Sequence, residues 1–108
     1  MSIQHADKRV YLYDTTLRDG AQTSEVNFSV EDKNTIAGWL DELGIAYIEG
    51  GWPGANQTDT DFFASPPALQ AHFVAFGMTR RKGHSAENDA GLKTVMDAAE
   101  HVCLFGKT

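Results

Sequence analysis

Four short apolar runs divide the 108-residue sequence at nearly regular intervals, and each interval holds one segment with helical periodicity. The runs begin near residues 10, 45, 73 and 101, so the repeat is about 30 residues, the size of one βα unit. Strands that alternate with helices form a parallel sheet, in a (β/α)8 barrel or in an open doubly wound sheet. The sequence therefore predicts an α/β fold with parallel, buried strands.

The first helical segment has a start signal and a stop signal. Ser29 is followed three residues later by Asp32, which predicts a capped helix over about 30–43 that Gly44 ends. The charged residues of this segment, Lys33 among them, are expected to lie mostly off its apolar stripe. The residues expected to form that stripe are Ile36, Leu40 and Leu43.

Two further helices are expected. Asn56 or Thr58 can cap a short helix that runs through 62–63, and Ser85 can cap a third, longer helix. The apolar face of the third helix is expected to contain Leu92, Val95, Met96 and Ala99.

The segment after the first strand favours the barrel over the open sheet. An open dinucleotide-binding sheet usually has a glycine-rich phosphate turn there, whereas this chain has 14–20, Asp-Thr-Thr-Leu-Arg-Asp-Gly. A complete barrel takes roughly 200 residues or more. We therefore expect residues 1–108 to form the first half of one barrel domain. Such a half exposes a strand edge, so we expect it to be part of a longer protein or to associate.

Parallel strands bring the loops at their carboxyl ends to one edge of the sheet, where barrel enzymes keep their chemistry. The loops expected at this edge are Asp14–Gln22, Glu49–Asn56, Thr79–Lys82 and Gly106–Thr108. Candidate functional residues are therefore sought in these four segments.

Carboxylates in the first loop suggest a cation site. Asp14 and Asp19 supply hard oxygens, which suit Mg²⁺ or Mn²⁺. An alternative of about equal weight is that Asp14 binds amides of its own loop and that Asp19 pairs with Arg18. The spacing of these residues does not decide between the two.

Arg18 and Glu49 are candidates for binding a charged substrate. The planar guanidinium of Arg18 can grip a carboxylate or stabilise an enolate oxygen, although a surface ion pair explains it equally well. Glu49 ends a buried strand and needs a partner, for which Arg18 is a candidate. Arg80 and Arg81 belong to a loop that is more simply interpreted as a solvated basic loop.

Composition excludes some classes of protein. A net charge of −6 argues against a nucleic-acid-binding surface. No apolar stretch approaches the length that crosses a membrane, and the first residues lack the hydrophobic segment of a signal peptide. With a single cysteine the chain has no internal disulfide. We expect a soluble, cytoplasmic protein.

The segment 14–22, DTTLRDGAQ, resembles the signature of the metal-dependent acyl-CoA condensing enzymes and lyases built on a TIM barrel. This family includes the 2-isopropylmalate, homocitrate and citramalate synthases. Four further segments resemble the citramalate synthase branch in particular: 47–54 (YIEGGWPG), 62–63 (FF), 76–82 (FGMTRRK) and 105–107 (FGK). The resemblance covers nearly the whole chain.

The resemblance implies a reaction and a set of roles. Acetyl-CoA and pyruvate would condense to (R)-citramalate on a route to isoleucine, with Mg²⁺ or Mn²⁺ as cofactor. By the resemblance Asp19 is a metal ligand, Arg18 holds the α-keto acid and stabilises the developing negative charge, and Glu49 supports this chemistry. The substrate-binding residues expected on this basis are Arg18, Gln22, Thr79 and Arg81.

Several alternatives remain open at this point. The same family contains enzymes that use another α-keto acid and lyases that cleave a carbon–carbon bond, and a non-catalytic half-barrel would have the same length. A His-x-His pair and a regulatory region, both expected by resemblance, would lie beyond Thr108, so we expect this chain to be inactive alone. The full-length protein is expected to be a homodimer.

Overall fold

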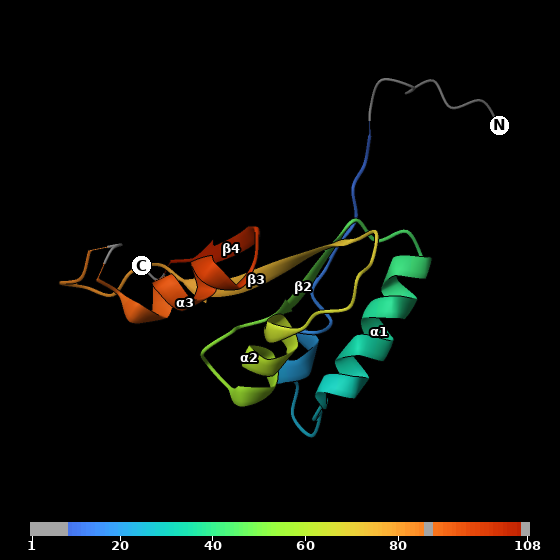
Figure 1. Ribbon diagram of the computed structural model, residues 1–108, viewed down its shortest axis with the longest axis horizontal. Helices are drawn as coiled ribbons and strands as arrows, with labels where there is room; N and C mark the ends of the chain where they lie inside the picture. Colours follow the sequence, from blue (N-terminus) through green and yellow to red (C-terminus); the bar gives the residue numbers. More distant parts are fainter. Residues whose placement is uncertain (1–8, 86–87, 107–108) are drawn as a thin grey trace.

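The structure is a computed structural model that describes residues 9–85 and 88–106 (Figure 1). Its four strands are β1 (Tyr13–Asp14), β2 (Tyr47–Gly51), β3 (His72–Met78) and β4 (His101–Phe105). They form one sheet in the order β1-β2-β3-β4, and every neighbouring pair is parallel. The α/β prediction is confirmed, and the arrangement is that of the first half of a (β/α)8 barrel. Residues 107–108 of the expected last loop lie outside the described residues.

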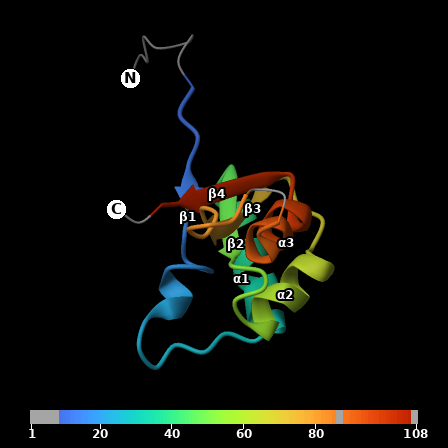
Figure 2. The same cartoon turned by 90° about the vertical axis from the view of Figure 1, so that its left-hand side faces the viewer.

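One α-helix follows each of the first three strands. The helices are α1 (Val30–Glu42), α2 (Gln57–Ala64) and α3 (Ala90–Ala98), and a 3-10 turn, η1 (Gly20–Gln22), precedes α1. Figure 2 shows the three α-helices on the same side of the sheet. Within the described residues, no helix combines the length and the apolar character needed to cross a membrane.

Side-chain caps begin the helices. At α1 the Ser29 hydroxyl accepts the Asp32 amide and the Asp32 carboxylate accepts the Ser29 amide, both at 3.0 Å, as expected. Asn56 caps α2, also as expected. The expected cap of α3 is wrong, because Asp89 accepts the Leu92 amide at 3.0 Å. Ser85 instead accepts an amide in the turn that precedes α3.

The core lies between the helices and the sheet. Alternate residues of each strand point to the helices, so that Ile48 and Ala75 are fully buried together with Phe62 of α2. The helices pack directly on the strand backbone at two glycines. A Cβ at Gly50 would lie 2.7 Å from the Phe62 ring, and a Cβ at Gly77 would lie 2.7 Å from Val95. These close approaches leave no room for a side chain at either strand position.

In the described part of the chain, no α-helix covers the opposite face of the sheet (Figure 2). Rings from the four strands gather on it: the centroid of the Tyr47 ring lies 6.4, 5.5 and 5.6 Å from those of Tyr13, His72 and His101. The expectation of a buried first strand is wrong. Val10 is 86% exposed, and the regular strand contains only Tyr13 and Asp14. β1 pairs only with β2 among the described residues, so its second edge and its inner face meet solvent.

The helical stripes are confirmed in part, because Ile36 and Leu40 of α1 and Ala99 at the end of α3 pack, partly buried, against the core. The buried centre of α1 consists of Lys33 and Ala37, whereas Leu43 is 75% exposed. On α3 only Val95 is buried, and Met96 is 51% exposed. The face of α1 is set by the loop after β1 and by α2, which enclose Lys33, rather than by hydrophobicity alone.

Candidate active site

The loop after β1 is a compact turn with its own hydrogen bonds. The Thr15 carbonyl accepts the amides of Arg18, Asp19 and Gly20 at 3.1, 2.7 and 3.2 Å. The Asp14 carboxylate accepts the Thr16 amide at 2.8 Å and the Thr16 hydroxyl at 3.1 Å. Asp14 therefore has the role that was considered as the alternative to a cation site, that of stabilising its own loop.

Leu17 anchors this loop, and Arg18 extends from it over β2 and β3. Leu17 is fully buried in the core. The Arg18 Nε donates to the carboxylate of Glu49, and the guanidinium carbon lies 4.0 Å from the centroid of the Phe76 ring. Trp52 supports that ring from its edge, with centroids 5.3 Å apart. The partner that the buried Glu49 required is therefore Arg18, the residue suggested for it.

Glu49 has a second partner, which the sequence analysis missed. The Tyr13 hydroxyl donates to the other carboxylate oxygen of Glu49. Burial, followed by the hydrogen bond to Glu49 and its negative charge, raises the pKa of Tyr13 well above its usual range, so the hydroxyl stays protonated as a donor. The register could have revealed this contact. Tyr13 pairs with Tyr47, and Glu49 lies two residues further along the same face.

Glu49 is thus a buried carboxylate held from two sides. Its side chain is 2% exposed, against 18% for that of Arg18. A buried charge in this setting needs both hydrogen bonds and an opposite charge, and here it has both. Within the described residues the terminal Nη groups of Arg18 make no hydrogen bond, although Nη1 lies 3.7 Å from Asp19. Arg18 is fixed through Nε and through its ring contact, and its terminal donors remain open.

Asp19 points outward and fits a cation only in part. Its side chain is 69% exposed. Its carboxylate oxygens are of the hard type that Mg²⁺ and Mn²⁺ prefer. Among residues 9–85 and 88–106, no group of three or more His, Cys, Asp or Glu side chains is close enough to hold a metal ion. Asp19 can supply one ligand, and its predicted role stays a prediction.

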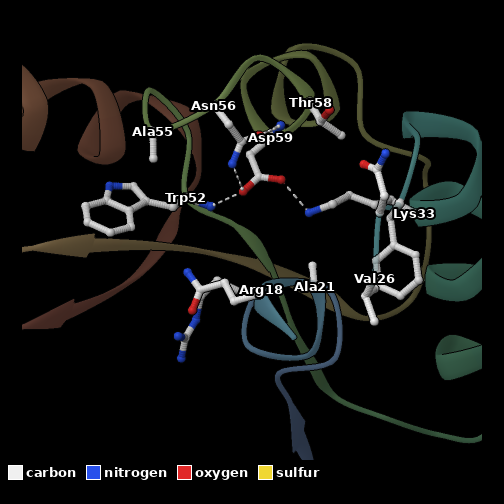
Figure 3. A pocket seen from close by; sticks show the side chains of 12 residues that line it. Arg18, Ala21, Val26, Lys33, Trp52, Ala55, Asn56, Thr58 and Asp59 are labelled. Atoms are coloured by element: carbon white, nitrogen blue, oxygen red, sulfur yellow. Dashed lines mark hydrogen bonds and ion pairs between the residues drawn. The ribbon is translucent and has the colours of Figure 1, made fainter. Parts of the chain in front are cut away.

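A cavity of about 240 Å³ lies beside Arg18 (Figure 3). Gln22 and Trp52 line it together with Arg18, so the structure brings Gln22 to the same site. Its floor contains a buried ion pair between Lys33 and Asp59, 2.5 Å apart. The sequence analysis missed this pair, although Lys33 lies four residues before Ala37, which is helical spacing for a shared face.

Thr79 and Arg81 lie in a neighbouring hollow. This hollow has a volume of about 410 Å³, and Trp52 lines both it and the first cavity. The Asp89 carboxylate accepts the Arg81 amide at 2.7 Å and the Arg81 Nε at 3.4 Å. Together with the Leu92 amide, these contacts lower the pKa of Asp89 to about 2. The Arg81 side chain is 66% exposed, as expected for a solvated loop.

The predicted residues therefore occupy one edge of the sheet but two hollows. Arg18 and Gln22 line the first, Glu49 is bonded to Arg18 without lining it, and Thr79 and Arg81 line the second. Trp52 forms the wall between them, and sequence reasoning gave it no role. Trp52 directly follows β2, and its contact with Phe76 of β3 is visible only in the tertiary structure.

The chain is similar to known proteins over most of its length. The HMGL-like family model matches residues 9–101. The (R)-citramalate synthase of Geobacter sulfurreducens is 52% identical over 103 residues, which cover 92% of this chain and 20% of that protein. The (R)-citramalate synthase of Synechocystis sp. is 50% identical over 103 residues, with coverage of 92% and 19%. This chain thus spans about one fifth of the length of the curated relatives that it matches.

A related enzyme of different name matches a shorter part. The homocitrate synthase AksA of Methanocaldococcus jannaschii is 52% identical over 54 residues, which cover 50% of this chain and 13% of that protein. The similarity to the citramalate synthases therefore extends over nearly twice as much of the chain.

Proposed function

The chain belongs to the HMGL-like family, and on that premise we propose that the full-length protein is an (R)-citramalate synthase. The enzyme would condense acetyl-CoA with pyruvate, and water would then cleave the thioester to give (R)-citramalate and CoA, in the biosynthesis of isoleucine. The extent of the similarity favours this substrate over those of related synthases, since it covers 92% of the chain rather than half.

The observation that supports the proposal most directly is the state of Arg18. Its Nε is held by the buried Glu49 and its plane rests on Phe76, while its terminal Nη groups make no hydrogen bond within the described residues. A guanidinium oriented in this way can bind a carboxylate through two parallel hydrogen bonds. The α-keto acid carries such a carboxylate next to its reacting carbonyl.

We assign the following roles to the residues of this chain. Arg18 binds the carboxylate of the keto acid and stabilises the negative charge that develops on the carbonyl oxygen as the new carbon–carbon bond forms. Glu49 orients Arg18, and Tyr13 orients Glu49. Gln22 contributes a polar group at the cavity rim. Thr79 and Arg81, in the second hollow, would contact the more distant part of a substrate.

Asp19 would hold a divalent cation together with ligands from outside the described residues. When bound, Mg²⁺ or Mn²⁺ supplies Lewis-acid polarisation of the keto carbonyl. The base that removes a proton from acetyl-CoA is also expected elsewhere in the longer protein. We therefore propose that the 108-residue chain is inactive alone.

A competing proposal stays within the family. A 2-isopropylmalate or homocitrate synthase would have the same loop and the same Arg18, and the local match to a homocitrate synthase is the observation that favours it. The two proposals differ in which α-keto acid reacts.

The test uses the full-length protein with acetyl-CoA, Mg²⁺ or Mn²⁺ and one α-keto acid at a time, with release of the CoA thiol as the measurement. We expect pyruvate to react with a kcat/KM at least about tenfold above that of a branched or a dicarboxylic keto acid, the discrimination that a small substrate pocket provides. Preference for another keto acid would replace the citramalate assignment with its alternative.

Variants of Arg18 test its role. We expect Arg18→Ala to lose activity and Arg18→Lys to raise the KM for pyruvate, because lysine keeps the charge but not the planar pair of donors. The matched control is Arg80→Ala, since Arg80 is exposed and donates to the His84 carbonyl. Wild-type activity in Arg18→Ala would refute the assignment.

A further inference from the structure

Lys33 is a buried ammonium group that the proposed reaction does not use. It lies in the middle of the buried face of α1 and is 1% exposed. Its Nζ donates to the carbonyl oxygens of Leu17 and Gly50, both at 2.7 Å, and to the carboxylate of Asp59 at 2.5 Å. An ammonium has three donors, so all three are satisfied.

Asp59 extends this set of contacts to the loop after β2. Its second oxygen accepts the Trp52 amide at 2.8 Å and the Asn56 side-chain amide at 3.1 Å. Figure 3 shows the carboxylate between Lys33 and the start of that loop. One ion pair thus connects α1, α2 and the segment that carries Trp52.

The two carbonyl groups lie next to the two residues that meet at the proposed site. Leu17 directly precedes Arg18, and Gly50 directly follows Glu49. The contact between Arg18 and Glu49 joins two loops, and the same Lys33 ammonium is bonded to both backbones. The Lys33 ammonium therefore joins the two backbones directly beside the residues that meet.

We propose that Lys33 and Asp59 are positioning residues, which set the geometry of Arg18 and Glu49 for the α-keto acid. This inference rests on the proposed function. A buried ion pair is weak as a source of stability, because removal of both charges from water costs about as much as their attraction returns. The Lys33–Asp59 pair instead fixes the relative position of the loops, since an ammonium with three fixed acceptors is compatible with one arrangement of them.

The first experiment observes the geometry without catalysis. In the full-length protein labelled with ¹⁵N, the Arg18 Nε–H that is bonded to a buried carboxylate should give a resolved, slowly exchanging NMR signal. We expect Lys33→Met to move this signal to the position of exposed arginines or to broaden it away. The control is Lys93→Met, which removes an exposed ion pair with Asp97 on α3 and should leave the signal unchanged.

The second experiment separates positioning from simple destabilisation. Loss of folded protein lowers the apparent kcat but does not change KM. For folded Lys33→Met we expect the KM for the α-keto acid to rise, kcat/KM to fall between about tenfold and a hundredfold, and the KM for acetyl-CoA to stay within about twofold. If circular dichroism shows that this variant does not fold, Asp59→Ala, which removes one of the three acceptors of Lys33, replaces it in both experiments.

The outcomes are distinct. An unchanged Arg18 signal, or an unchanged KM for the keto acid, in the folded variant would overturn the positioning role. A wild-type protein that condenses no keto acid would overturn the proposed function, while the NMR result would still decide whether Lys33 holds Arg18 against Glu49.

Discussion

Replacement of Gly51 by alanine tests how closely the loop after β2 is packed on the ion pair. A Cβ at this position would lie 2.5 Å from Cγ of Asp59 and 2.6 and 2.7 Å from its two oxygens. The backbone has φ of +150°, which side chains rarely adopt. The new methyl group must therefore displace the carboxylate from Lys33 and from the Trp52 amide.

The size of the effect follows from three contributions. Overpacking of a well-packed site costs about 1–3 kcal/mol. The unfavourable backbone conformation costs about 1–3 kcal/mol more. The reduced freedom of the unfolded chain offsets about 0.4–1 kcal/mol. We expect a net loss of about 3 kcal/mol, which with a urea slope of about 1.5 kcal/mol per M lowers the unfolding midpoint by about 2 M.

The assay is equilibrium unfolding of the full-length protein in urea, followed by tryptophan fluorescence, with Gly38→Ala as the matched control. A Cβ at Gly38 meets no atom within 4 Å, and the residue lies inside α1. There alanine should raise the free energy of unfolding by about 0.5–1 kcal/mol. If the midpoint of Gly51→Ala stays within about 0.5 M of the wild type, the packing argument is wrong.

Three further predictions follow from the described contacts. Tyr13→Phe removes a donor to the charged Glu49 and should lower the free energy of unfolding by about 1 kcal/mol. This is less than a hydrogen bond to a charged group usually contributes, because Tyr13 is 44% exposed. The control, Tyr11→Phe, should change the free energy of unfolding little in the same urea assay. The pKa of Asp89 is about 2 in the folded state and about 3.9 in an unfolded chain, so the stabilising effect of its carboxylate is complete above about pH 4 and disappears as the pH falls through 2. The difference in the free energy of unfolding between wild type and Asp89→Asn, measured in urea at several pH values, should therefore vanish at the acid end. A difference that stays constant with pH would contradict this. In the isolated 108-residue chain, the outer edge of β1 has no partner strand within the described residues. We therefore expect this chain to associate, detected by analytical ultracentrifugation, or to unfold, detected by circular dichroism. A stable, folded monomer would disprove this.

Much of the fold follows from signals that act within one or two turns of chain. Ser29 and Asp32 begin α1 because each satisfies an amide of the other, and both partners lie within four residues. The strand–helix repeat near 30 residues is a longer signal. It implies a parallel sheet, because a crossover helix must fit between two neighbouring parallel strands. These predictions are confirmed. The predicted cap of α3 was wrong because Ser85 and Asp89 are both acceptable capping residues, and the local sequence does not select between them.

The site could be located from the sequence but not assembled from it. The loop motif and the strand ends place Arg18, Gln22, Glu49, Thr79 and Arg81 at one edge, since the carboxyl ends of parallel strands coincide. The pairing of Arg18 with Glu49 was suggested because a buried carboxylate needs a counter-charge, and the structure contains it. The division into two hollows with Trp52 between them has no such local signal.

The sequence by itself determined the order of strands and helices and the edge of the sheet that carries the polar loops. It also indicated that Glu49 needs a positively charged partner. Only the tertiary structure decided that Lys33 is inside the protein, that Tyr13 binds Glu49 and that the run 10–13 is exposed. The physical reason is distance along the chain. The acceptors of Lys33 lie 16, 17 and 26 residues away, so the cost of burying its charge is met by groups that come together only when α1, α2 and the sheet have packed.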